Sequence, residues 1–200
     1  MSTITETSVV PDAPWVPSPL YRFTLDQYEA MVTSGAFTAK DSFHLINGFL
    51  VAKMTQNDPH STADELCGEA LSRLIPAGWH VRASKPVRLP PDSKPDPDRC
   101  IVRGTIRDYS NRSPGSADVG LIVEVSDSSL LEDRKVALVY AASGIPVYWI
   151  VNLVERQVEV SADPSPVGYQ SSRYYRVGQD VPVVLDGVEV GQIAVADLLL

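Results

Sequence analysis

Two long apolar segments constrain the fold of this chain more than any other feature. The first, VGLIVEV (119–125), is apolar at nearly every position, which is typical of a central strand covered on both faces. The second, PVYWIVNL (146–153), has the same character. Together they predict two buried strands of one sheet.

A helix is predicted between these two strands. Ser129 and Glu132 match the S-x-x-E capping box, which marks a helix start. The helix should run to Ser143, because Gly144 can terminate it in a left-handed conformation and Pro146 cannot continue it. A strand, a helix and a second strand in this order predict a parallel pair with a right-handed crossover.

The remaining patterns predict a mixed sheet flanked by helices, with additional antiparallel hairpins, and so an α/β fold class. Hairpins are expected where Asn-Gly and Asp-Gly pairs interrupt apolar runs, in segments 44–54 and 181–191. Further strands are expected at 79–89, 98–104 and 154–160, helices at 24–35 and 58–75, and a loop at 106–118.

Length and composition predict a single domain over residues 21–200, after a flexible, proline-containing tail over residues 1–20. The net charge of −8 argues against a protein that binds nucleic acid or membrane over its whole surface. Cys67 and Cys100 form no metal or redox motif, so two buried free thiols are expected. Neither a membrane-spanning run nor a secretory signal is evident, and a cytoplasmic protein is the expectation.

Glu124 is the residue that fits its surroundings least well. It lies within LIVEV, where a charged carboxylate is costly unless it is paired, hydrogen-bonded or bound to metal. Strand alternation places it on the same face as Ile122 and Ser126. It therefore predicts either a functional acid near the ligand-binding end of the strand, or a buried glutamate satisfied by an arginine or by backbone amides.

A second acid could meet Glu124 if the strand that follows SKPDPD (93–98) is its neighbour. Asp98 directly precedes the apolar segment, whereas Asp96 lies beyond Pro97, so we favour Asp98 and treat Asp96 as a flanking loop acid. Paired carboxylates suit Mg²⁺, with Mn²⁺ as the alternative ion. Lys135, on the helix after Glu124, is the candidate for stabilising developing charge; Arg134 is equally close in sequence, and a solvated lysine is the alternative.

These motifs resemble the Uma-two type of restriction endonuclease family, within the PD-(D/E)XK nuclease superfamily. The resemblance rests on NGFLVAKM, SKPDPDRCIVRG, ADVGLIVEVSDSSL and GIPVYWIVNLVERQVEV and extends from about Leu25 to the C-terminus. It implies a restriction-endonuclease-like α/β core and divalent-metal-dependent phosphodiester cleavage. A nuclease-derived binding or regulatory module is the competing hypothesis, because a shared fold does not prove shared chemistry.

The resemblance also implies roles for individual residues. It places the family's two acids on Asp98 and Glu124, and Ser126 stands where the superfamily's E-x-K lysine would be. Lys135 would then replace that lysine from the helix. His44 stands where the family usually has a glutamate, and His60 matches a family histidine that we interpret mainly as part of the helix entry.

DNA is the expected partner of such an enzyme, although the chain as a whole is acidic. Residues 82–112 carry eight of its 17 basic residues, bracket Asp98, and are the candidate surface for contacts to the DNA backbone; ordinary solvated charge is the alternative. A homodimer is a further expectation, since two sites are the simplest way to cut both strands.

Overall fold

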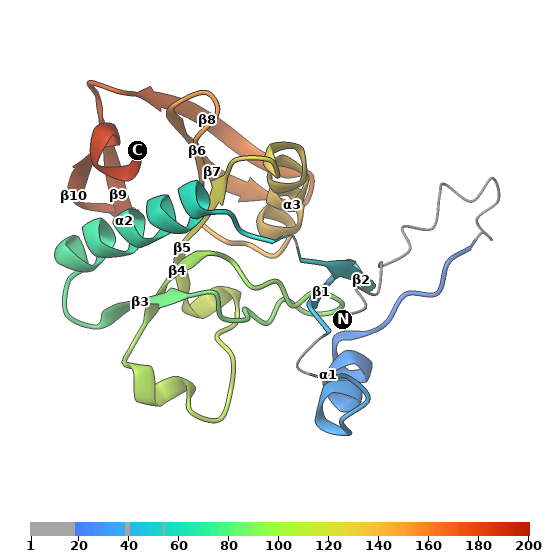
Figure 1. The fold of residues 1–200 in the computed structure, drawn as a ribbon. Helices are drawn as coiled ribbons and strands as arrows, with labels where there is room; N and C mark the ends of the chain where they lie inside the picture. The colour runs from blue at the N-terminus through green and yellow to red at the C-terminus, as the bar shows by residue number, and fades with distance from the viewer. Residues whose placement is uncertain (1–18, 39–40, 54) are drawn as a thin grey trace, which may run out of the picture.

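The computed structural model describes residues 19–38, 41–53 and 55–200, so nearly all of the predicted tail lies outside the described residues. Its centre is a six-stranded mixed sheet of order β3-β4-β5-β6-β7-β8 (Figure 1). The bounds are β3 Trp79–Ala83, β4 Arg99–Arg103, β5 Val119–Ser126, β6 Val147–Asn152, β7 Gln157–Ser165 and β8 Gly168–Arg176. Among the strands of this sheet, only β5 and β6 pair in parallel, and α3 (Leu130–Ala142) connects them, as the sequence predicts.

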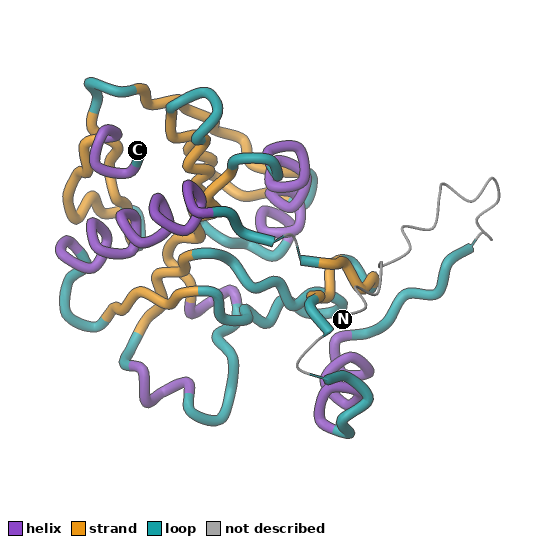
Figure 2. Tube along the Cα trace, in the orientation of Figure 1, coloured by secondary structure: helices purple, strands orange, loops and turns teal. Residues whose placement is uncertain are grey.

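The two faces of the sheet bury different sets of side chains. On one face, α2 (Asp58–Leu74) and the hairpin of β9 (Asp180–Leu185) and β10 (Val188–Ala194) cover the odd-numbered residues of β6 and those of β5 from Leu121 onward. On the other face, α3 covers the even-numbered residues, including Ile122 and Tyr148. Figure 2 shows the helices on the outside of the central strands. Glu124 therefore faces α3, as strand alternation predicts.

A separate hairpin lies beside the sheet and is not part of it. It consists of β1 (Phe43–Ile46) and β2 (Phe49–Ala52), which turn across Asn47 and Gly48 as expected. Backbone bonds attach it to the long segment between β3 and β4; for example, Lys94 N–H donates to the carbonyl of Leu45 at 2.7 Å. The short helix α1 (Leu25–Thr33) precedes the hairpin and has the capping box of Thr24 and Gln27.

Two predicted elements differ from the structure, and two observed elements were not predicted. The strand predicted at 79–89 ends at Ala83, because Ser84 has a positive φ of 46° and Pro86 follows it. The predicted loop at 106–118 contains two 3₁₀ helices, η1 (Ile106–Tyr109) and η2 (Ser116–Asp118). A third, η3 (Val195–Leu198), closes the chain, and β8 was not predicted at all.

The predicted capping box at the start of α3 is also wrong. Ser129 has ψ near 7° rather than the extended conformation of a side-chain cap, and it makes no capping hydrogen bond. Its hydroxyl instead donates to Asp133 Oδ2 at 2.6 Å, one helical turn along. Within the described residues, no helix has the length and hydropathy needed to cross a lipid bilayer.

Candidate active site

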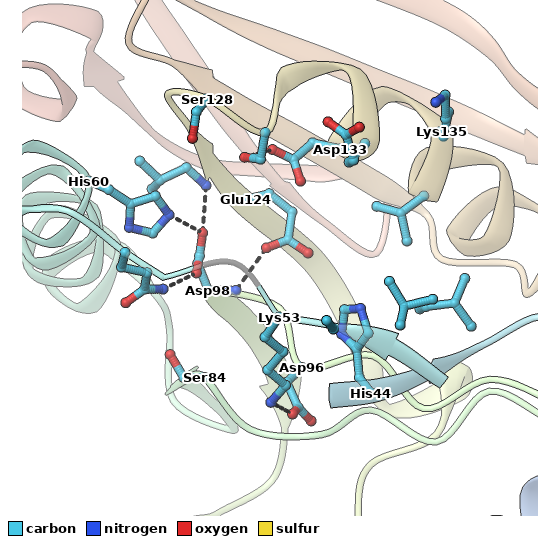
Figure 3. A pocket seen from close by; sticks show the side chains of 18 of the residues that line it. His44, Lys53, His60, Ser84, Asp96, Asp98, Glu124, Ser128, Asp133 and Lys135 are labelled. Atoms are coloured by element: carbon cyan, nitrogen blue, oxygen red, sulfur yellow. Dashed lines mark hydrogen bonds and ion pairs between the residues drawn. The ribbon is translucent and has the colours of Figure 1, made fainter. Parts of the chain in front are cut away.

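Asp98 and Glu124 are brought together by the pairing of β4 with β5. The two strands are antiparallel neighbours, with Arg99 opposite Val123. At the end of this ladder the backbone N–H of Asp98 donates to Glu124 Oε2 at 2.9 Å, and the N–H of Val125 donates to Asp98 Oδ2 at 2.8 Å. The side chains thus continue the ladder and hold the two carboxylates side by side, as Figure 3 shows.

The Asp98 carboxylate is enclosed by polar groups from α2 and the segment before it. Gln56 donates to Asp98 Oδ1 at 2.9 Å, and His60 Nε2 lies 3.1 Å from Oδ2 (Figure 3). Burial alone would lower the pKa of His60, but the bond to Asp98 and the charges of Asp98, Asp64 and Asp133 outweigh it, so this pKa is raised. His60 is therefore held against Asp98 as a partner that favours its protonated form.

Glu124 has hydrogen-bond donors but no cationic partner among the described residues. Tyr140 donates its hydroxyl to Glu124 Oε1 at 2.9 Å, opposite the oxygen that binds the Asp98 amide. Burial, together with the negative charges of Asp98 and Asp133, raises the pKa of Glu124 well above its usual value. A carboxylate in this position would be stabilised by a bound cation.

Asp133 adds a third carboxylate to the same surroundings from α3. Burial, with a smaller contribution from the charge of Asp98, raises its pKa to about 6, although the hydrogen bond from Ser129 opposes this shift. Its backbone carbonyl accepts the hydroxyl of Tyr148 at 3.0 Å, which fixes this turn of the helix against the sheet. Three acids, from the residue before β4, from β5 and from α3, thus lie in one region, where His60 is the cationic partner of Asp98.

These acids line a pocket of about 460 Å³ between the β1–β2 hairpin, the start of α2, β5 and α3. On the hairpin side, Lys53 forms an ion pair with Asp96, and both lie below Glu124 in Figure 3. His44 also lines this wall, where burial lowers its pKa and its Nδ1 has no hydrogen-bond partner. The pocket therefore has an acidic wall and a facing wall that carries a lysine and a histidine.

Comparison with known proteins identifies the family. A family model described as "Putative restriction endonuclease", Uma2, matches residues 25–196. The chain belongs to the Uma2 family. A solved structure, described as a "putative nuclease belonging to DUF820 from Anabaena variabilis ATCC 29413", matches with a TM-score of 0.66 at 15% identity, covering 88% of this chain and 97% of that one. At this identity the likeness concerns the fold, which is a nuclease fold. No curated protein matches the sequence significantly.

The other residues predicted for the Uma2 site lie in different places. Lys135 lines the pocket with an exposed side chain on α3, apart from Asp98 and Glu124 in Figure 3. Arg134 does not line it: its guanidinium binds Glu159 on β7, at 3.0 and 2.6 Å. Ser126, at the E-x-K position, is fully buried. The structure thus brings Asp96, His44 and Lys135 to the pocket and keeps Arg134 away from it.

Sequence reasoning missed two residues of this site. His60 was interpreted as part of the helix entry, and its backbone N–H does bond to the cap Asn57, but its side chain reaches Asp98. Asp133 was not considered. Helical periodicity was the available signal, because His60 shares a face with the buried Cys67, and Asp133 with the buried Tyr140.

The predicted DNA-contacting segment, residues 82–112, is largely neutralised by the protein itself. Within the described residues, carboxylates pair with five of its eight basic side chains: Arg88, Lys94, Arg99, Arg103 and Arg112. Arg99, for example, binds Asp64 of α2 through two hydrogen bonds of 2.5 and 2.8 Å. Most of this charge therefore stabilises the fold.

The donor set of the Uma2 pocket suits a hard divalent cation. Within residues 19–38, 41–53 and 55–200, no three His, Cys, Asp or Glu side chains are arranged as a complete ligand group. Mg²⁺, however, is usually held by only one or two carboxylates and completes its shell with water and substrate phosphate. Asp98 and Glu124, which the backbone hydrogen bonds hold side by side, would supply such a pair.

Proposed function

We propose that this protein is a divalent-metal-dependent endonuclease that hydrolyses phosphodiester bonds in DNA. One observation carries the proposal: Asp98 and Glu124 are fixed together by main-chain hydrogen bonds at a pocket where no cation balances Glu124 among the described residues. Membership of the Uma2 family and the nuclease fold support it.

In this proposal Asp98 and Glu124 hold Mg²⁺, or Mn²⁺ in its place. The ion would polarise a phosphoryl oxygen and lower the pKa of a bound water. The Val125 amide and Gln56 orient the Asp98 carboxylate, while Tyr140 and the Asp98 amide orient Glu124. These bonds fix both acids before any substrate arrives, which is the arrangement that electrostatic catalysis requires.

Lys135 is proposed to approach the substrate phosphate at the mouth of the pocket. It is exposed and has no carboxylate partner within the described part of the chain, so its charge is available to a phosphate. Lys53 is less available because it pairs with Asp96. Replacing each lysine by glutamine separately, and measuring cleavage, distinguishes the two.

Cleavage of supercoiled plasmid in Mg²⁺ or Mn²⁺ tests the proposal. Wild-type protein should convert plasmid to nicked and linear forms, and Asp98→Ala or Glu124→Ala should lower the rate by at least about 100-fold, the scale on which removal of one stabilising group acts. Glu132→Gln is the matched control, because Glu132 is an exposed carboxylate at the same pocket. Equal inactivity of all four proteins, with no heat of metal binding in calorimetry, would refute the proposal.

A nuclease-fold protein that binds or regulates without cutting is the second candidate. The observation in its favour is the replacement of the E-x-K lysine by the buried Ser126. It predicts that wild-type protein binds DNA without cleaving it, and that Asp98→Ala binds equally well. Cleavage that is lost in Asp98→Ala excludes it.

A further inference from the structure

A second cleft, of about 590 Å³, lies between α1, the start of the segment after β3 and the loop that follows η1. Four cationic side chains line it: Arg82, Arg88, Lys94 and Arg112. Glu29 is its one lining carboxylate among the described residues, and the hydroxyls of Thr33, Ser110 and Ser113 add polar surface. The composition of this lining suits an anion.

Arg82 and Arg112 are both placed by the ring of Tyr109. Their guanidinium carbons lie 5.2 and 4.7 Å from the ring centroid. The ring is itself fixed, because Tyr109 is buried and its hydroxyl donates to the carbonyl of Arg103 at 2.7 Å. Two planar cations held on one aromatic ring keep a fixed orientation, which lowers the entropy lost when they bind a ligand.

Arg82 is the cation of the cleft whose charge is not balanced. Glu29 binds both Arg88 and Lys94, and Asp118 binds Arg112. Arg82 has no ion pair with any described residue, and its Nε is buried without a hydrogen-bond partner. The residue as a whole is half-buried, and no described residue accepts a hydrogen bond from its guanidinium, so its terminal nitrogens are the donors left for an anion in the cleft.

We infer that this cleft binds a phosphate of a nucleic-acid backbone, through the guanidinium of Arg82 with Arg112 beside it. Arginine presents paired donors that match the oxygens of a phosphodiester. The cleft and the active-site pocket share one segment of chain: Arg82 is two residues from Ser84, and Lys94 two from Asp96, both of which line the pocket. This inference rests on the proposed function, because it assigns the cleft to a strand whose scissile phosphate lies in the pocket.

Binding of a fluorescein-labelled DNA duplex, measured by anisotropy in EDTA so that no cleavage occurs, tests the inference. Arg82→Gln should bind about tenfold more weakly than wild type, the effect of losing one charge-assisted contact. The slope of log affinity against log salt should fall by about one, as expected for one lost phosphate contact. Arg112→Gln should weaken binding in the same direction.

The matched control is Arg176→Gln. Arg176 is an exposed arginine on β8, at the opposite edge of the sheet from β3. Its replacement should therefore leave the affinity for DNA unchanged. Arg82→Lys keeps the charge without the planar fork and should recover part of the affinity, which also serves if Arg82→Gln does not fold. Equal affinity of Arg82→Lys, Arg112→Gln and wild type, or no binding by wild type, overturns the inference.

The outcome can be separated from that of the proposed function. Plasmid cleavage that depends on Asp98, combined with unchanged DNA binding by the Arg82 and Arg112 variants, refutes phosphate binding in the cleft and leaves the nuclease activity in place. Binding that depends on Arg82 without any cleavage refutes the nuclease activity and leaves the phosphate site in place.

Discussion

The active-site pocket and the second cleft are lined by the same segment of chain, but their carboxylates are in opposite electrostatic surroundings. In the cleft, Glu29 binds two cations at once, and salt bridges hold the pKa of its carboxyl below the usual value despite its burial. In the pocket, Glu124 and Asp133 have raised pKa values, because burial and neighbouring acids oppose their ionisation.

This difference shows what each region contributes to stability. Ion pairs in the cleft lower the free energy of the folded state, whereas acids in the pocket raise it until a cation or a proton arrives. Replacing a paired charged residue of the cleft by a neutral one should therefore lower the stability of the protein, whereas neutralising an acid of the pocket should raise it. Unbalanced charge, rather than the number of charged residues, marks the positions where a ligand is expected.

The largest expected effect comes from Asp133→Asn in metal-free buffer. A pKa raised from 3.8 to about 6 means that ionised Asp133 destabilises the folded state, so the variant should gain on the order of 1 to 3 kcal/mol in free energy of unfolding at pH 8. The folded protein holds this proton more tightly than the unfolded chain, so wild-type stability rises relative to the variant as pH falls from 6 to about 4. Urea denaturation at pH 8 and pH 4.5 measures both effects.

Glu132→Gln is the control for that experiment, because Glu132 is the exposed neighbour of Asp133 on α3. It should show no comparable gain at either pH. A loss of stability in Asp133→Asn at pH 8 would show that the pocket acids are balanced like those of the cleft.

Tyr140→Phe should have the next largest effect and the opposite sign. The tyrosine hydroxyl donates to Glu124, and a hydrogen bond to a charged group contributes about 1.5–3 kcal/mol against about 0.5–1.5 for a neutral bond. Tyr148→Phe is the matched control, since the Tyr148 hydroxyl donates to a backbone carbonyl. Denaturation at pH 8.5 should show a greater loss for Tyr140→Phe, and equal losses would indicate that Glu124 is uncharged there.

Arg88→Gln should have the smallest effect, a loss below about 1 kcal/mol, because partly exposed ion pairs are screened by water and salt. The loss should shrink further in 1 M NaCl, where the Debye length is only about 3 Å. Thermal unfolding at low and high salt measures it. A salt-independent loss would mean that Arg88 acts through packing rather than through charge.

Sequence alone predicted the parts of this molecule that depend on local pattern and strand neighbours. The crossover of β5, α3 and β6, both Gly-containing hairpins and the proximity of Asp98 to Glu124 are confirmed. Each follows from an apolar run, a turn dipeptide or the pairing of adjacent strands. Strand β8 was missed because GYQSSRYYR is an edge strand with mostly exposed, polar side chains and lacks a clear apolar alternation.

The details of the pocket depend on helix rotation, which sequence does not determine. Successive helical residues point about 100° apart, so Arg134 reaches Glu159 of β7 while Lys135 lines the pocket. The positions of His60 and Asp133 likewise depend on how α2 and α3 dock onto the sheet.

The main-chain bonds that fix Asp98 and Glu124 make the geometry of these two acids independent of the hairpin that faces them. These acids are held at the end of the β4–β5 ladder, whereas His44 and Lys53 come from a hairpin that pairs only with itself among the described strands. Backbone bonds, the buried Leu45 and the ion pair of Lys53 with Asp96 join this hairpin to the rest of the chain. A hairpin of this kind can be exchanged or lengthened without changing the register of β4 and β5. A change in the hairpin would then alter the wall that carries His44 and Lys53 and leave the geometry of the two acids intact.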